Sequence, residues 1–185
     1  RIVKFSSNIG AVKIGETIGP KALHRTLTQF GFGRETGMQF PGETGGSLIA
    51  GQRWTRFDVA AASFGQGVSV SALQLTTAAA AIANDGILMK PRVVRAITDS
   101  RGRVVREFKP QQISRVISPQ TAAHVTRMMA LVVSEGGTGT QAALEGYTAG
   151  GKTGTAQKIG PSGTYAKNLY VSSFLGFAPL EEPRL

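Results

Sequence analysis

The feature of this sequence that most limits its fold is the order of its helical and strand patterns. Helical patterns dominate the first part of the chain, and strand patterns dominate the last part. There is no internal repeat and no regular alternation of strands with helices, which a parallel α/β sheet requires. We therefore predict an α+β fold in which helices pack on an antiparallel sheet.

Glycine and proline delimit the first helical segments. Asn8 is expected to cap a short segment, NIGAVKIG, and Pro20 stands in the first turn of a second predicted helix that ends at Gly31. Residues 31–67 are rich in glycine and turn residues, as in GFGRETG and PGETGGS. We expect this stretch to be a long surface excursion with little regular structure.

Two later segments are clearer helix predictions. Ser71 and Gln74 form a capping box at the start of SALQLTTAAAAIAN. Ser118 and Pro119 begin an amphipathic segment that ends at Gly136. The apolar residues of this segment recur at helical spacing: Val125, Met128, Met129, Val132 and Val133.

Two β-hairpins are predicted. RVVRAIT and RVVREF flank the turn DSRG, and KTGTAQKI and NLYVSSFLGFA flank a turn around GPSG. A further apolar run, ISRVI, lies between the first hairpin and the helix predicted to begin at Ser118. The second hairpin supplies the strand-rich end of the chain.

The composition is that of one globular domain, because 41% of the 185 residues are hydrophobic and 17% are charged. The net charge is +10, but the basic residues are scattered, and no aromatic residues interleave with the densest set, Arg101, Arg103 and Arg106. We expect a solvated basic surface and no nucleic-acid partner. The absence of cysteine excludes disulfides, thiolate catalysis and cysteine-ligated metals.

Lys152 fits two incompatible motifs. GYTAGGKT matches the phosphate-binding loop G-x-x-x-x-G-K-[ST], which needs a buried strand before it and a helix directly after the lysine. The residues before Gly146 are not those of a buried strand, and Gly154, Gly160 and Pro161 follow the lysine. We therefore expect no nucleotide site here.

A strand through Lys152 suits the residues better. Thr153 and Thr155 would share one face of the strand, within reach of one carboxylate, and Gly154 would leave bare backbone between them. With the charge of Lys152, this pattern indicates a receptor for an extended peptide that ends in a carboxylate. The residues alone equally allow an ordinary strand with polar side chains facing water.

The start of the chain decides between these interpretations. Ser6-Ser7-Asn8 matches the S-x-N element that accompanies K-T-G in penicillin-binding proteins and serine β-lactamases. From Ser6 to the end, the amino-acid sequence resembles the transpeptidase domain of class B penicillin-binding proteins, and most of all that of the division-septum enzymes. The stretches that carry the resemblance are SSNIGAVKIG, FGFG, FPGE, SFGQGVSVSALQLTTAAAAIANDG, LMKPRVV, AGGKTGTAQK and SFLGFAP. The resemblance implies a penicillin-binding-protein/serine β-lactamase-like fold.

One element of the family is not in this chain. The family's nucleophile is the serine of S-x-x-K, and no serine here has a lysine three positions later. In the family that motif lies upstream of S-x-N, and this chain begins at Arg1 and ends with PLEEPRL. We expect residues 1–185 to be the C-terminal portion of a transpeptidase domain, which should not acylate without the upstream segment.

The resemblance implies catalytic roles for Ser6 and Lys152 and a substrate-binding role for Asn8. The missing serine would attack the bond between two D-alanines of a peptidoglycan stem peptide, and an amine of a second stem would then attack the acyl-enzyme. Ser6 would relay protons, and Lys152 would touch Ser6 and raise the positive potential. Asn8 would hydrogen-bond the amide of the bound peptide.

The resemblance also implies binding roles for Thr153, Gly154 and Thr155, the three residues after Lys152. Thr153 and Thr155 would hold the terminal carboxylate, and the backbone N–H of Thr155 would be one donor of the oxyanion hole, commonly worth about 3 kcal/mol. Gly154 would let the acyl group pack against the strand. No metal or other cofactor is expected, and His24 and His124 are expected to serve packing or the surface.

The implied partners are peptidoglycan stem peptides, β-lactam antibiotics, and other division or wall-synthesis proteins. The implied location is the extracytoplasmic face of the cell membrane, held by an N-terminal anchor that this chain does not include. Two alternatives stay open at this point. One is a D,D-carboxypeptidase or β-lactamase of the same fold, and the other is a non-catalytic homologue that binds β-lactams.

Overall fold

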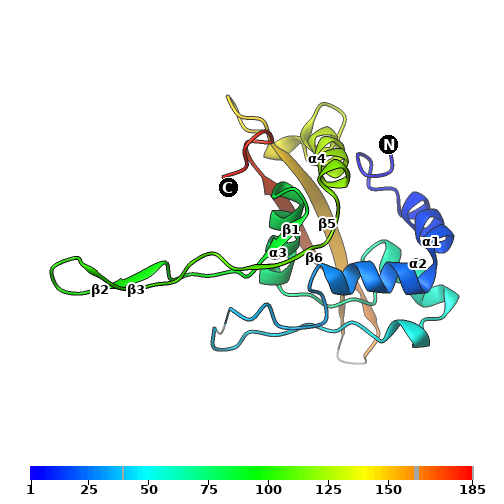
Figure 1. Ribbon diagram of the computed structural model, residues 1–185. Helices are drawn as coiled ribbons and strands as arrows, with labels where there is room; N and C mark the ends of the chain where they lie inside the picture. Colours follow the sequence, from blue (N-terminus) through cyan, green and yellow to red (C-terminus); the bar gives the residue numbers. More distant parts are fainter. Residues whose placement is uncertain (39, 161–162, 185) are drawn as a thin grey trace.

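The computed structural model describes residues 1–38, 40–160 and 163–184. A long β-hairpin formed by the last two strands runs through the middle of the molecule. The last two α-helices pack on it, whereas the first two α-helices pack on each other (Figure 1). A second hairpin projects far from the body. This arrangement confirms the predicted α+β fold with helices packed on antiparallel strands. No helix of the described ranges combines the length and apolar character needed to cross a membrane.

Helix α1 (Asn8–Gln29) consists of two straight parts joined at Gly19, whose φ of 79° breaks the helix before Pro20. This matches the two predicted segments. The predicted cap was wrong by one residue, because Ser7, not Asn8, caps the helix by accepting the N–H of Gly10 at 3.2 Å. Ser7 has extended φ and ψ, so the helical conformation begins only at Asn8.

Helix α2 (Arg56–Ser63) lies within the stretch predicted to have little regular structure, and it packs on α1. That prediction was therefore wrong in part. Thr55 accepts the N–H of Asp58, and the Asp58 carboxylate accepts the N–H of Thr55 at 2.8 Å, which is a complete capping box. A short 3₁₀ turn, η1 (Gly51–Arg53), precedes it.

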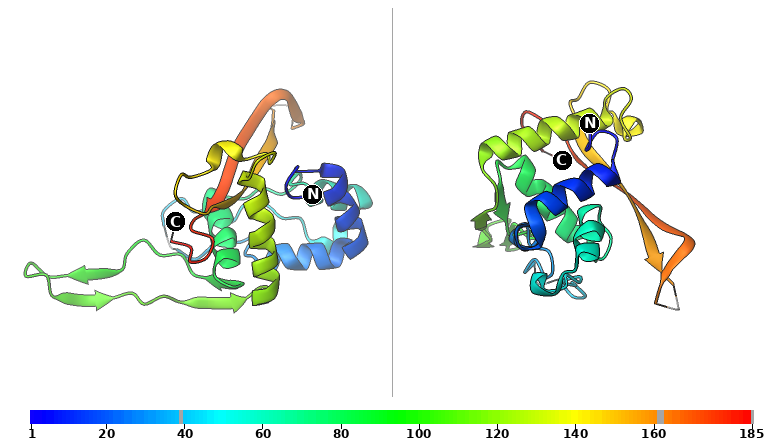
Figure 2. Two further views of the ribbon diagram at one scale, coloured as in Figure 1. Left: turned by 90° about the horizontal axis from the view of Figure 1, so that it is seen from above. Right: turned by 90° about the vertical axis from the view of Figure 1, so that its right-hand side faces the viewer.

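Helices α3 (Ala72–Ala83) and α4 (Pro119–Val133) begin at the predicted caps, Ser71 and Ser118. Both pack on the central hairpin, and α3 also packs on α4 (Figure 2). Their apolar faces and the strands beside them form the core. Its buried residues are Ala78, Ala79, Ala81, Leu88, Ala122, Met129, Val132, Val133, Phe177 and Ala178.

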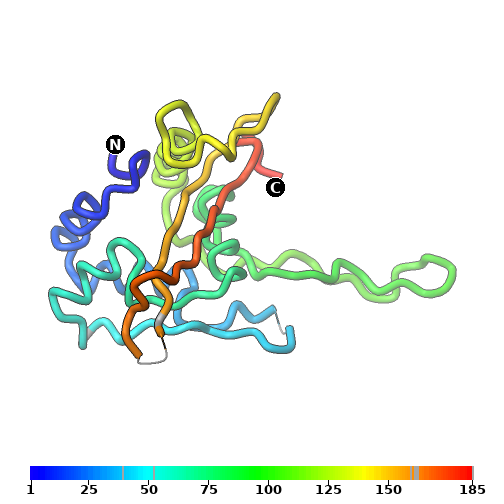
Figure 3. The backbone as a smooth tube through the Cα atoms, turned by 180° about the vertical axis from the view of Figure 1, so that it is seen from behind, coloured from blue at the N-terminus to red at the C-terminus, as the bar shows by residue number. Residues whose placement is uncertain are grey.

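The central hairpin joins β5 (Gly150–Ile159) to β6 (Tyr165–Phe177), as predicted. The strands are antiparallel, with Lys152 opposite Leu175 and Gly154 opposite Ser173. Part of the turn predicted around GPSG lies outside the described residues. The two strands can be followed side by side along most of the molecule in Figure 3.

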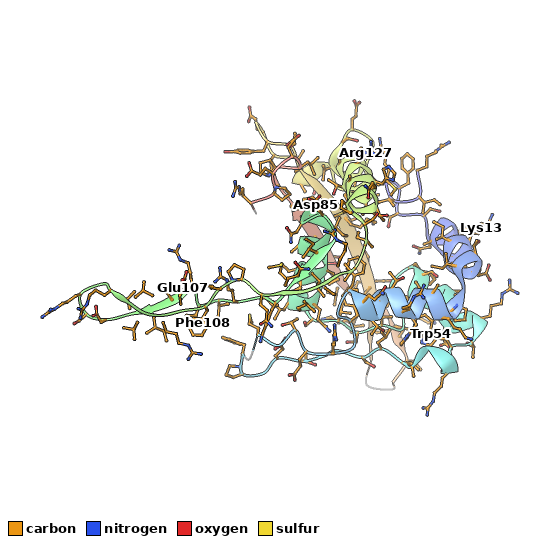
Figure 4. All side chains as sticks on the ribbon, in the orientation of Figure 1. Lys13, Trp54, Asp85, Glu107, Phe108 and Arg127 are labelled. Atoms are coloured by element: carbon orange, nitrogen blue, oxygen red, sulfur yellow. The ribbon has the colours of Figure 1, made fainter. Side chains whose placement is uncertain are left out.

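The remaining strands form the projecting hairpin and its base. β1 (Ile87–Met89) pairs with β4 (Gln112–Arg115), and β2 (Ala96–Thr98) pairs with β3 (Val104–Glu107), which confirms the first predicted hairpin. We call residues 92–109 the arm. Figure 4 shows its side chains, including Glu107 and Phe108, spreading into the surroundings rather than onto the body.

Candidate active site

The first turn of the chain lies against the start of β5. The Nζ of Lys152 donates a hydrogen bond of 2.8 Å to the Oγ of Ser6, across a separation of 146 positions in the sequence. A second contact joins the same parts of the molecule, because the Nζ of Lys4 donates to the carbonyl of Glu135 at 2.8 Å. The serine-asparagine and lysine-threonine motifs are therefore neighbours in space.

A cleft of about 1060 Å³ opens between these two parts. The N-terminal turn, α1 and α2 form one wall, and β5 with the turn after α4 forms the other. All six residues that the sequence indicated for the site line this cleft: Ser6, Asn8, Lys152, Thr153, Gly154 and Thr155. The structure thus brings the whole predicted set to one place.

Ser6 occupies an unusual backbone conformation. Its φ is 51°, in the left-handed region that few residues other than glycine adopt. The turn that holds it is closed by three backbone hydrogen bonds, from Phe5 to Arg1, from Ser6 to Val3 and from Ser7 to Ile2. Strain of this kind persists where the surrounding structure enforces it, and here it presents the Ser6 hydroxyl to the cleft.

Lys152 is a half-buried cation whose neighbours are neutral oxygens. Besides Ser6, its Nζ donates to the carbonyl of Thr153 at 2.7 Å and lies 3.5 Å from the Oγ1 of Thr153. It forms no ion pair within the described ranges. Burial lowers the pKa of its ammonium group, because desolvation disfavours the charged form. The charged Lys152 side chain therefore makes this end of the cleft attractive to an anion.

The residues after Lys152 alternate along β5. Thr153 hydrogen-bonds Thr138, with 2.9 Å between the two Oγ1 atoms, and Thr155 is exposed in the cleft. A Cβ on Gly154 would come within 2.6 Å of the Oγ of Ser173 on β6. Glycine at this position therefore relieves the contact with β6 as well as leaving the cleft side bare.

The two glycines before Lys152 have a packing role. Both lie in β5 and are buried, and a Cβ on Gly151 would come within 2.2 Å of the Phe174 ring. The strand continues after the lysine to Ile159, so no helix N-terminus faces Lys152 from that side. The phosphate-loop geometry is absent from this part of the chain.

Asn8 and the histidines have different surroundings. Asn8 is the first residue of α1, and its exposed side chain lines the cleft. His24 lies on α1 against Trp54, with a ring-centre distance of 5.6 Å in an edge-to-face arrangement, and His124 is exposed on α4. Neither histidine lines the cleft.

Sequence reasoning missed several residues of the cleft. Thr138, Phe57, Tyr165 and Tyr170 line it without belonging to either motif. Tyr165 also accepts the N–H of Gly67 at 3.2 Å, which ties β6 to the segment after α2. No spacing rule connects these residues with Lys152, because the fold alone brings them together.

The fold and the site define a class of protein with a serine-asparagine turn set against a K-T-G strand. A family model described as the penicillin binding protein transpeptidase domain matches residues 1–185, and the chain belongs to this family. Its relatives place it among the class B members, which confirms the resemblance read from the sequence.

Three curated relatives illustrate this. Penicillin-binding protein PbpB of Mycolicibacterium smegmatis is 38% identical over 97% of this chain and 28% of its own length. Stage V sporulation protein D of Bacillus subtilis is 39% identical over 100% and 28%. The probable peptidoglycan D,D-transpeptidase PenA of Neisseria gonorrhoeae is 35% identical over 100% and 30%. The chain thus spans less than a third of the length of these relatives.

Solved structures agree with the fold. Penicillin binding protein 3 of Mycobacterium tuberculosis, complexed with aztreonam, superposes with a TM-score of 0.90 at 37% identity, over 99% of this chain and 42% of that one. The TP domain of Burkholderia pseudomallei penicillin-binding protein 3 gives a TM-score of 0.86 at 39% identity, over 99% and 52%. The predicted fold class is therefore confirmed at the level of the family.

Proposed function

We propose that residues 1–185 form the C-terminal portion of a serine-type D,D-transpeptidase domain that cross-links peptidoglycan stem peptides. The observation that carries this proposal is the 2.8 Å hydrogen bond from Lys152 to Ser6 at the edge of the cleft. The nucleophilic serine and its S-x-x-K lysine come from a segment outside these residues. The names of the curated relatives favour transpeptidation over the carboxypeptidase and β-lactamase alternatives.

Ser6 is proposed to carry protons for the reaction. The nucleophile forms an ester bond with the penultimate D-alanine carbonyl, and the C–N bond to the terminal D-alanine breaks. The leaving nitrogen needs a proton, so the Ser6 hydroxyl can give its own proton to that nitrogen and take up the proton that the attacking serine loses. Because Lys152 donates to the Ser6 oxygen, the hydroxyl proton of Ser6 stays free to move.

Lys152, Thr153 and Thr155 are proposed to bind the terminal carboxylate of the stem peptide. The lysine supplies positive charge without a competing carboxylate in the described structure, and the threonines supply hydroxyl donors along one face of β5. Gly154 gives the acyl group access to bare backbone. The N–H of Thr155 is proposed as an oxyanion donor, and Asn8 as the partner of the substrate amide.

β-Lactams are proposed as inhibitors of this site. They carry an anionic group beside a reactive amide, so they present the same charge and the same carbonyl as the stem peptide. Structures of the Mycobacterium tuberculosis relative are complexed with aztreonam and with ampicillin. For this chain we propose the same class of ligand in the cleft beside Lys152.

The setting of the reaction is proposed from its substrate. Peptidoglycan lies outside the cytoplasmic membrane, so the whole protein would work at the extracytoplasmic face, held by an N-terminal anchor outside residues 1–185. Other division or wall-synthesis proteins are proposed as partners, on the basis of the similarity to the division-septum enzymes.

Labelling of the full-length protein with a fluorescent penicillin tests the proposal. We expect a covalent adduct that unlabelled ampicillin prevents, and we expect Lys152→Ala to slow its formation sharply without lowering the melting temperature. The release of D-alanine from a stem pentapeptide should rise when an acceptor amine is added. If no adduct forms, the enzymatic proposal is contradicted. If the release of D-alanine does not change when the acceptor amine is added, a carboxypeptidase is favoured.

A further inference from the structure

We propose that Thr138 is a positioning residue for carboxylate recognition, which rests on the proposed function of the cleft. Its hydroxyl would turn the hydroxyl of Thr153 toward the bound carboxylate. Thr138 lies in the turn after α4 and belongs to neither sequence motif. Its Oγ1 is 2.9 Å from the Oγ1 of Thr153, and both residues line the cleft.

The hydrogen-bonding capacity of a hydroxyl leads to this assignment. Either threonine could donate in the free protein, because each hydroxyl has one proton and two acceptor lone pairs. A carboxylate can only accept, so Thr153 must use its single proton to bind it. The hydrogen bond between the threonines must then run from Thr138 to Thr153.

Lys152 completes the arrangement around the Thr153 oxygen. Its Nζ lies 3.5 Å from the Oγ1 of Thr153, at the outer limit of a hydrogen bond, on a side chain that is already held by Ser6. With Thr138 and Lys152 both donating, the two lone pairs of the Thr153 oxygen are occupied. The O–H bond of Thr153 is then directed away from both donors and stays available to an anion in the cleft.

The turn that carries Thr138 is anchored to the core. The N–H of Gly139 donates to the carbonyl of Val132 at 2.9 Å, and Gly139 is buried, where a Cβ would come within 3.2 Å of the Phe174 ring. Lys4 holds the same turn through the carbonyl of Glu135. Thr138 is thus held on a fixed backbone, as a positioning residue must be.

The experiment compares two probes on the full-length protein: ampicillin, which has a free carboxylate, and ampicillin methyl ester, which lacks it. The ratio of their second-order acylation rate constants measures carboxylate recognition. We expect Thr138→Val to lower the rate with ampicillin by about tenfold, because a misdirected Thr153 hydroxyl binds the carboxylate less well, and to leave the rate with the ester unchanged. Thr138→Ser should restore most of the ratio.

Two controls separate positioning from packing. Thr140→Val places the same change on an exposed neighbour and should alter neither rate. Thr138→Ala gives the same comparison if valine packs badly at this position. In a double-mutant cycle with Thr153→Val, the losses with ampicillin should not add, because Thr138 would act only through Thr153.

Three outcomes would overturn the inference and leave the proposed function standing. An equal slowing of both probes by Thr138→Val would make the residue structural. Additive losses in the cycle would mean that Thr138 contacts the carboxylate by itself. If ampicillin acylates the wild-type protein but Thr138→Val leaves the ratio of the two acylation rate constants unchanged, only the role of Thr138 is rejected. Failure of ampicillin to acylate the wild-type protein would instead reject the proposed function, and this inference with it.

Discussion

At the scale of single residues, the charge on Lys152 has a cost and a use. Burial disfavours the ammonium form and lowers the pKa of Lys152 below its usual value of 10.5, although the Nζ donates hydrogen bonds to Ser6 and to the Thr153 carbonyl. The folded protein therefore holds this proton less tightly than the unfolded chain does. An anion that enters the cleft would therefore stabilise the charged form of Lys152.

The stability of the fold should respond to this difference. Between the lowered pKa of Lys152 and 10.5, the unfolded chain binds more protons than the folded protein, so the free energy of unfolding should rise with pH in that window. Below the window the contribution of Lys152 should be constant. Denaturant unfolding at several pH values should show this rise in the wild-type protein and its loss in Lys152→Met. A rise that the variant retains would assign it to other groups.

The residues of the site were predictable to different extents. Ser6, Asn8 and Lys152 could be found because their motifs have fixed spacing within a few positions. The contact with Thr138 could not, because it depends on the place where the turn after α4 meets β5. A lone threonine hydroxyl in a glycine-rich turn has no pattern of its own.

At the scale of elements, Gln74 holds the segment before α2 to helix α3. Its side chain is 1% exposed, and the two N–H bonds of its Nε2 donate to the carbonyls of Arg34 and Gly45, both at 2.9 Å, while the Gly31 carbonyl lies 3.3 Å away and shares one of these protons. Its Oε1 accepts the N–H of Ser71 at 2.8 Å. Gln74, the third helical residue in the capping box of α3, is therefore also the anchor of a long loop.

Replacing this side chain should be costly. Gln74→Leu would leave several part-buried carbonyls without a donor, and we expect it to lower the free energy of unfolding by about 3 kcal/mol. Thr76→Ala, on the exposed face of the same helix, should cost well under half of that. Urea denaturation of the three proteins measures both changes. Equal losses in the two variants would contradict the anchoring role.

The helices predicted from their caps are the ones that formed as expected. Ser71 and Ser118 were recognisable because strong apolar patterns follow them. Helix α2 obeys the same rule through Thr55 and Asp58, but its eight residues and glycine-rich surroundings gave too short a pattern to separate it from the loop. Ser7 and Asn8 are adjacent and either could cap α1. Ser7 does so because its φ and ψ are extended, and the sequence alone does not reveal these angles.

At the scale of the whole molecule, the cleft separates two packed units. Helices α1 and α2 pack on each other, whereas α3 and α4 pack on the strands. Side-chain hydrogen bonds from Lys152 to Ser6, from Lys4 to Glu135 and from Gly67 to Tyr165 bridge the units. The position of Ser6 therefore depends on contacts outside the reacting groups.

Lys4 tests this dependence. Lys4→Met removes the hydrogen bond to the Glu135 carbonyl, so the N-terminal turn should exchange its amide hydrogens faster while α4 keeps its protection. Acylation by a β-lactam should slow by about three- to tenfold, because Ser6 is held less firmly once one hydrogen bond to a carbonyl is lost. Lys13→Met, exposed on α1, is the matched control. Unchanged exchange in the turn would show that other contacts hold Ser6.

The 146-position separation between Lys152 and Ser6 has a consequence for assembly of the protein. Strands β5 and β6 are adjacent in the chain and close a short loop, whereas the pair at the cleft must overcome the entropy of closing a loop of 146 positions. Local unfolding of either the N-terminal turn or β5 breaks the hydrogen bond between Lys152 and Ser6. Covalent labelling by a penicillin would therefore count only molecules that have completed folding.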